Sequence, residues 1–206
     1  MNLSACSSLS RRPQTGVWYR AIDPKYFPQA LETVHARSVP SRFYCPGGAT
    51  SFELLYLAEN HLVAMMEVQG LLGTPTTPGS VISNPGRPWV LVSVDVQLQQ
   101  TVDLTDVSST ETLLASTAQE LTGDWRAYTQ RGIGAGIPAP VGQAPTQELG
   151  CALYLLEPPL EGFVTFSAKL PYHRILCIFR NHLAPGSYAR FRVETSDGTR
   201  THTIKG

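Results

Sequence analysis

The sequence has little charge, and the charges it has cancel. Charged residues make up 16% of the 206 residues, and 16 basic and 16 acidic side chains give a formal net charge of zero. Nucleic-acid-binding proteins usually carry a basic excess, so direct binding to nucleic acid is not expected. The hydrophobic fraction of 42% suits a folded chain, and a chain of this length forms one sizeable core more readily than two. The sequence therefore predicts a single domain.

The sequence also lacks long apolar runs and closely spaced cysteines. No stretch approaches the roughly 18 apolar residues of a transmembrane helix, and residues 1–16 hold no apolar run that would suit a signal peptide. The four cysteines are far apart, with no C-x-x-C pair, so free thiols in a reducing compartment are more typical than disulfides. We therefore expect a cytoplasmic protein that does not contact membranes.

Motifs for metals, nucleotides and hydrolase nucleophiles are absent as well. None of the five histidines is spaced with another ligand type as a metal site requires, so no metal is expected. Gly132, Gly134 and Gly136 resemble a nucleotide-binding loop only superficially, because Ile137 stands where its third glycine belongs and Pro138 follows. Ser167 has no G-x-S-x-G around it, which argues against a hydrolase nucleophile elbow.

Strands and helices are predicted in an irregular order. Alternating apolar residues and turn signals predict strands at 17–22, 54–57, 89–98, 163–166, 174–179 and 188–194. Helices are expected at 27–35, 61–72, 108–121 and 147–156, with a Gly- and Pro-rich loop at 132–145. Because no regular βαβ alternation is visible, the expected class is α+β, with mixed β-sheets and flanking helices. Residues 1–14 are expected to form a flexible tail, and residues 15–206 the single domain.

Three charged residues stand out because their surroundings are apolar. Glu67 shares its predicted helix face with small and apolar residues, so an ionised carboxylate there needs a polar partner. It is either a surface residue at a domain edge or a cleft carboxylate that stabilises a developing cation. Arg20 lies within an apolar strand, and Arg42 precedes Phe43-Tyr44 and a glycine-rich turn. Both are either solvated strand-end cations or a pair that binds a diphosphate.

A series of short motifs, in order, resembles the RES family, which is named for its Arg, Glu and Ser. No single motif is decisive, but their shared order over residues 17–183 makes chance an unsatisfactory explanation. The matching segments are Val17-Trp18-Tyr19-Arg20, Ser41-Arg42-Phe43-Tyr44 with Pro46-Gly47-Gly48, Leu55-Tyr56-Leu57-Ala58-Glu59, Leu62 to Val68 with Glu67, Thr146-Gln147-Glu148-Leu149-Gly150, Gly162 to Ala168 with Ser167, and Ile178-Phe179 to Leu183. Two departures concern the pocket rim: Tyr44 stands where Asn is usual, and Ala49-Thr50-Ser51 lengthens the following turn.

The resemblance implies a fold similar to ADP-ribosyltransferases and a toxin of a toxin–antitoxin pair. Its members consume NAD⁺ as substrate, without another cofactor, and their antitoxins resemble Xre-type repressors. On this basis Glu67, Arg20 and Ser167 are the expected catalytic residues. Arg42 and Tyr56 are expected to bind the substrate, Arg42 at the diphosphate and Tyr56 at nicotinamide.

Three functions stay open from the sequence. The first is cleavage of the nicotinamide–ribose bond of NAD⁺, by hydrolysis or phosphorolysis, which depletes the cellular pool. The second is ADP-ribosylation of a specific protein, and the third is a RES-like binding module without catalysis. The acceptor, the oligomeric state and the role of the segment after residue 183 are also open, and a homo-oligomer is compatible with the sequence.

Overall fold

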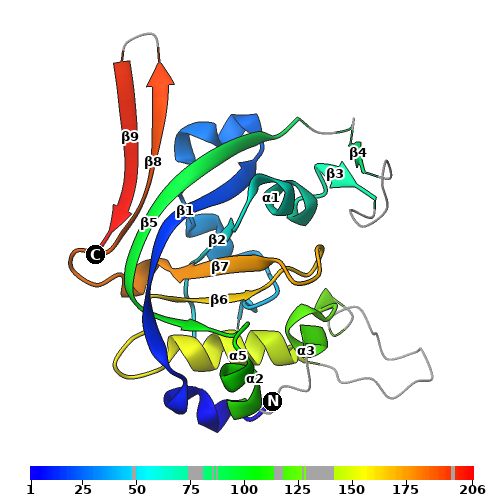
Figure 1. Cartoon of the computed structure of the whole chain (residues 1–206), viewed down its shortest axis with the longest axis vertical. Coiled ribbons are helices and arrows are strands. Elements are labelled where there is room, and N and C mark those ends of the chain that lie inside the picture. Colours follow the sequence, from blue (N-terminus) through cyan, green and yellow to red (C-terminus); the bar gives the residue numbers. More distant parts are fainter. Residues whose placement is uncertain are drawn as a thin grey trace.

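Seven strands form one mixed sheet in the order β1-β2-β7-β6-β5-β8-β9. The computed structural model describes residues 1–47, 50–73, 81–84, 86, 88–113, 118–126, 128, 142–195 and 198–206. β1 also pairs with β5, so β1, β2, β7, β6 and β5 are linked in a closed ring, and the β8–β9 hairpin extends away from it (Figure 1). The strands are β1 (Arg11–Ile22), β2 (Leu54–Ala58), β5 (Val90–Asp103), β6 (Gly162–Phe166), β7 (Arg174–Phe179), β8 (Tyr188–Thr195) and β9 (Gly198–Lys205).

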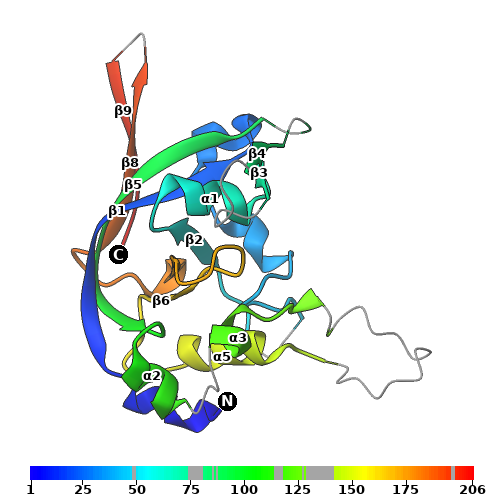
Figure 2. The same ribbon diagram turned by 45° about the vertical axis from the view of Figure 1, so that its right-hand side comes forward.

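Helices gather at two places around this sheet. Figure 2 shows α2 (Val107–Thr112), α3 (Ala118–Thr122) and α5 (Pro145–Tyr154) at one end of the molecule, near the N-terminus, while α1 (His61–Glu67) lies beside β1 and β2. β3 (Leu71–Leu72) and β4 (Ile82–Ser83) form a separate two-stranded sheet. Four 3₁₀ helices complete the described elements, at Leu3–Ser8, Pro24–Gln29, Val34–Arg37 and Arg180–His182. The pairing of β5 with β6 is parallel and the others are antiparallel. The predicted α+β class is confirmed.

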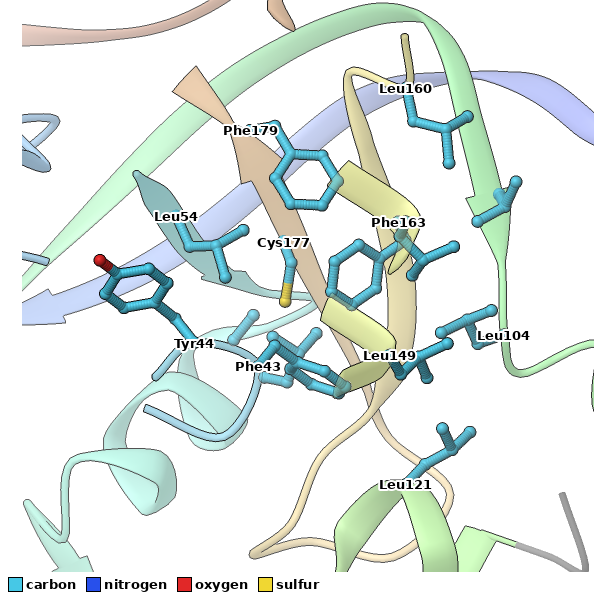
Figure 3. Close-up of a cluster of buried hydrophobic side chains, with 14 of the residues drawn as sticks. Phe43, Tyr44, Leu54, Leu104, Leu121, Leu149, Leu160, Phe163, Cys177 and Phe179 are labelled. Carbon is cyan, nitrogen blue, oxygen red and sulfur yellow. The ribbon is translucent and has the colours of Figure 1, made fainter. Parts of the chain in front are cut away.

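The core has two parts, one on each face of the central strands. In β7, Ile175, Cys177 and Phe179 pack in the first part, whereas Leu176 and Ile178 pack in the second. This alternation follows from the two-residue repeat of a strand, and both faces are apolar because both are covered. The first part lies between the sheet and α5, where Phe43, Phe163 and Phe179 meet Leu149 (Figure 3). Phe43 thereby anchors the segment that carries Arg42.

Several expected boundaries were wrong. Residues 1–14 are not a loose tail, because Leu3–Ser8 forms a 3₁₀ helix that buries Cys6, and β1 already begins at Arg11. The polar composition of this segment hid its role: β1 pairs with β5 from Arg11 onward. The helix expected at 27–35 is replaced by the two short 3₁₀ helices around it, since Pro28 removes a backbone donor.

The other differences concern two helices and the last strand. α1 ends at Glu67 rather than at residue 72, because Gln69 adopts a left-handed φ of 58° and the chain turns into β3. The helix expected at 108–121 is divided into α2 and α3, and residues 114–117 between them lie outside the described residues, as does most of the loop expected at 132–145. β9 was not predicted. No helix in the described part of the chain is long and apolar enough to cross a membrane.

Candidate functional site

A cavity of about 650 Å³ opens where β1, β2 and α1 face the segment that follows α3. Polar side chains of opposite charge line it, together with aromatic and small residues. The lining residues are Tyr19, Arg20, Ala21, Pro40, Ser41, Arg42, Tyr56, Leu57, Ala58, Ala64, Glu67, Val68, Thr122, Gly123, Asp124, Trp125, Arg126, Ala168, Lys169 and Ile175. Four of the five predicted site residues are among them, and the fifth, Ser167, contacts Glu67 directly.

Glu67 reaches the cavity from the last turn of α1. Asn60 caps this helix, with its side-chain oxygen accepting a hydrogen bond from the Val63 amide at 2.9 Å. Val63 and Ala64 are buried against the core, which fixes the rotation of the helix and brings half-buried Glu67 to the cavity. The structure therefore places this carboxylate in the lining of a cavity, which is the cleft alternative of the sequence analysis, and not at a domain edge.

Both hydrogen bonds to Glu67 go to the same oxygen. Ser167 Oγ donates to Glu67 Oε1 at 2.5 Å, and the Ala168 amide donates to it at 3.0 Å. The described residues provide no hydrogen bond to Oε2. Within the described part of the chain, Oε1 is therefore held in place by two donors, whereas Oε2 has no partner.

Arg20 and Arg42 both line this cavity, and one nitrogen of each guanidinium has no partner among the described residues. Nη1 of Arg20 and Nη1 of Arg42 are both buried, and no described residue accepts a hydrogen bond from either atom. Burial lowers the pKa of Arg20 from its ordinary value to about 10, because the charged form is poorly solvated there. Arg42 is 7% exposed, and its guanidinium lies 4.9 Å from the ring centre of Phe43. Buried donors of this kind normally have a partner, so an anionic ligand would complete the site.

Tyr56 connects β2 to the turn that carries Arg42. Its hydroxyl lies 2.9 Å from Ser41 Oγ and accepts a hydrogen bond from the Phe43 amide at 3.4 Å. Burial raises the pKa of the Tyr56 hydroxyl, which keeps it protonated and able to donate. The hydroxyl of Tyr56 thus fixes the turn, while the residue also lines the cavity.

Helix α5 holds the same turn from the other side. Gln147 Nε2 donates to the carbonyl oxygens of Ser41 at 2.9 Å and Tyr44 at 3.1 Å. Gly150 packs so closely that an added Cβ would stand 2.0 Å from the Phe43 carbonyl oxygen. The Thr146-to-Gly150 motif therefore has a local physical role: it lets α5 support the backbone next to Arg42.

The sequence did not reveal a further part of the cavity lining. Asp124, half-buried Trp125 and Arg126 form part of it, with the Arg126 guanidinium 4.9 Å from the Trp125 ring centre, and Lys169 adds a further cation. The adjacent Trp-Arg pair was visible in the sequence, but no motif or spacing tied it to Glu67. Within the described residues, no group of three or more His, Cys, Asp or Glu side chains is placed to hold a metal.

Comparisons with known proteins identify a family and a solved structure of similar fold. The sequence profile described as the RES domain matches residues 17–197. Among solved structures, the chain is similar to one described as the crystal structure of the M. tuberculosis MbcT-MbcA toxin–antitoxin complex, with a TM-score of 0.64 at 16% sequence identity. That match covers 98% of this chain and 91% of the other. No curated protein sequence matches.

Proposed function

This chain belongs to the RES domain family, and we propose that it is a toxin that cleaves the nicotinamide–ribose bond of NAD⁺. The observation that carries the proposal is the charge arrangement of one cavity. Glu67, whose Oε2 receives no hydrogen bond from the described residues, lines the same cavity as Arg20 and Arg42, and each arginine has a buried Nη1 without an acceptor among those residues. NAD⁺ requires both features: a diphosphate that needs cations, and a ribose that becomes cationic when nicotinamide leaves.

The chemistry explains why a lone carboxylate is sufficient. When the C–N bond to ribose breaks, its electron pair moves to the nicotinamide nitrogen, which loses its positive charge, so no general acid is required. Positive charge then develops on the ribose, and a fixed carboxylate lowers the energy of that state more than that of bound NAD⁺. In the proposed mechanism, Glu67 Oε2 faces the ribose and accepts a hydrogen bond from one of its hydroxyls.

The remaining residues follow from their positions. Arg20 and Arg42 would bind the diphosphate, since a guanidinium presents several donors in a plane that suits phosphate oxygens. Tyr56 would contact nicotinamide, and Ser167 would fix Glu67 against the reacting ribose through its 2.5 Å hydrogen bond. Trp125 also lines the cavity, and it is the aromatic surface that we assign to the adenine ring.

The incoming acceptor is water or phosphate. With water, an oxygen–carbon bond forms at the ribose and the displaced proton passes to solvent; with phosphate, the product is a ribose 1-phosphate ester. The test is to incubate the purified protein with NAD⁺, with and without phosphate, and to follow free nicotinamide. Bulk release without a labelled protein supports the proposal. Transfer of ADP-ribose to one protein band favours the second candidate, an ADP-ribosyltransferase. If neither nicotinamide release nor transfer is observed, a binding module without catalysis remains.

A toxin that consumes NAD⁺ has to be silenced in the cell that makes it. The structure of similar fold is described as a toxin–antitoxin complex, so we propose a cognate, Xre-like antitoxin that covers this cavity. Expression of the chain alone should arrest growth, and co-expression of the neighbouring gene should relieve the arrest and give a stable complex. A chain that is harmless when expressed alone would contradict the toxin role.

A further inference from the structure

The loop between β6 and β7 is folded around the hydroxyl of Ser167. Ser167 Oγ accepts hydrogen bonds from the amides of Lys169 at 3.1 Å and Leu170 at 3.0 Å, and the Ser167 amide donates to the His173 carbonyl at 2.7 Å. Because two donors already point at the oxygen, the hydroxyl proton is directed to Glu67 Oε1. The conformation of this loop therefore decides whether Glu67 is held in place.

A second carboxylate, outside the cavity lining, fastens the far end of this loop. Glu59 follows β2, and its Oε1 is hydrogen-bonded to His173 Nδ1 while its Oε2 accepts from Arg174 Nε at 2.9 Å. The Glu59 amide also donates to the Arg174 carbonyl at 3.1 Å. Burial alone would raise the pKa of Glu59, but the hydrogen bonds from Arg174 and His173 outweigh it and lower the pKa, so the carboxylate is ionised at neutral pH.

The outer part of the loop is a turn next to buried Leu170, closed by the hydrogen bond from the His173 amide to the Leu170 carbonyl at 3.3 Å. Residues 167–173 contain no helix or strand, and Tyr172 is 88% exposed with a left-handed φ of 65°. A non-glycine residue in that conformation persists where surrounding contacts impose it. The backbone bond between His173 and Leu170 closes the turn around Tyr172, and the side-chain bond from Glu59 to His173 fixes the residue that directly follows it.

We infer that Glu59 is a positioning residue for catalysis: it holds the 167–173 loop through His173 and Arg174, and the loop in turn holds Glu67 through Ser167. Glu59 does not line the cavity, so it acts on the reaction only through this chain of contacts. The inference rests on the proposed function for its effect on rate, whereas its effect on the loop is independent of any activity.

The kinetic test uses Glu59→Ala, with Asp95→Asn as the matched control. Asp95 is also a carboxylate paired with an arginine, Arg190, at 2.6 Å, and also accepts from a second donor, but it lies in β5 on the hairpin side. We expect Glu59→Ala to lower kcat about tenfold, as the loss of one aligned hydrogen bond in the transition state would, with KM nearly unchanged. Asp95→Asn should leave both unchanged.

Glu59→Gln should fall between wild type and Glu59→Ala. Its amide oxygen can still accept from Arg174, and its amide nitrogen can donate to the neutral His173 ring. The decisive comparison is Glu59→Ala in a Ser167→Ala background. If Glu59 acts through Ser167, its effect on kcat should shrink to less than about twofold there, because coupled residues are non-additive. A tenfold loss that persists without the Ser167 hydroxyl would overturn the inference.

Amide hydrogen exchange tests the same contacts without any reaction. In Glu59→Ala, the amides of Ala168, Lys169 and Leu170 should exchange faster than in wild type, and in Asp95→Asn they should not. Unchanged exchange in Glu59→Ala would overturn the inference, whatever the kinetics. A wild-type protein that releases no nicotinamide, but whose loop loosens in Glu59→Ala, would refute the proposed function and leave Glu59 as the residue that holds Glu67.

Discussion

Two glutamates in this molecule accept similar hydrogen bonds but differ in how many carboxylate oxygens those bonds occupy. Glu161, 1% exposed, uses both oxygens: Oε2 accepts from the amides of Gln99 and Gln100 at 2.5 and 2.7 Å, and Oε1 from the Ala184 amide at 2.8 Å. Glu67 has two donors on Oε1 and none from the described residues on Oε2. The first carboxylate joins β5, β6 and the chain before β8, whereas the second has an oxygen that no described residue binds.

The arginines of this molecule show a similar contrast between paired and unpaired groups. Arg12 and Arg174 form ion pairs with Asp103 and Glu59, while Nη1 of Arg20 and Nη1 of Arg42 are buried with no acceptor among the described residues. A buried donor left unpaired costs about 1–3 kcal/mol. Among the described residues, two such donors belong to arginines of one cavity that Glu67 also lines, and this coincidence is the reason for our proposal that the cavity binds a ligand.

Glu67→Gln should give the largest effect on activity. The amide keeps the size of the side chain and can still accept from Ser167, but it has no charge to oppose the positive ribose. Loss of one well-aimed electrostatic group typically lowers kcat by about 10²–10³. Steady-state nicotinamide release measures this, with circular dichroism to verify folding. Near wild-type kcat in a folded variant would refute the role that we give to Glu67.

Glu161→Gln should show the opposite pattern. Its amide group would turn an N–H toward one of the three backbone donors that now bind the carboxylate, leaving buried donors without an acceptor. We expect the free energy of unfolding to fall by about 2–3 kcal/mol, with kcat per folded molecule unchanged, because Glu161 lies outside the cavity lining. Urea denaturation measures the free energy of unfolding, and kinetics corrected for the fraction of folded protein measure kcat per folded molecule. Equal losses of kcat in both glutamine variants would abolish the distinction between the two carboxylates.

Arg20→Met should separate ligand binding from stability. Arg20 is charged at neutral pH, but its pKa is lowered to about 10, so the charged form has a higher free energy in the folded protein than in the unfolded chain. This destabilising contribution is fully present below the folded pKa and decreases only as the pH rises through it. Removing the charge should therefore leave the free energy of unfolding unchanged or raise it at neutral pH. KM for NAD⁺ should rise about tenfold or more, with a smaller fall in kcat.

Thermal unfolding with and without ADP-ribose provides the control for Arg20. A ligand that binds only the folded state raises Tm, so wild type should gain stability from ADP-ribose and Arg20→Met should gain much less. A large drop in the Tm of the ligand-free variant would instead make Arg20 a structural cation.

The sequence predicted the centre of the candidate site better than its surroundings. Continuous apolar runs located β7 at its observed bounds and β6 to within one residue, because central strands buried on both faces have a strong apolar signal. The order of short motifs identified the family. Glu67 was found because a charge among apolar residues is conspicuous, even though its helix ends five residues earlier than expected.

What the sequence did not predict depends on contacts between distant segments. The first half of β1, residues 11–16, is polar and exists through its pairing with β5, from Arg11↔Val102 onward. Trp125 joins the cavity only through tertiary packing. Glu59 was quoted as part of a motif, but its bond to His173, 114 residues away, has no local signature. Long-range register and side-chain pairing of this kind are not encoded in any short window.

Trp125→Ala should give the smallest effect and tests the wall of the cavity that Trp125 forms. Stacking of a base on an aromatic side chain contributes about 1–3 kcal/mol, and the half-buried position of Trp125 places it at the lower end, so KM for NAD⁺ should rise about fivefold. Nicotinamide mononucleotide, which has the reacting bond but no adenosine, should be cleaved equally by variant and wild type. Trp125→Phe retains an aromatic face and should recover most of the loss. If both substrates were affected alike, Trp125 would shape the reacting end of the cavity instead, and the assignment of adenine to this wall would be wrong.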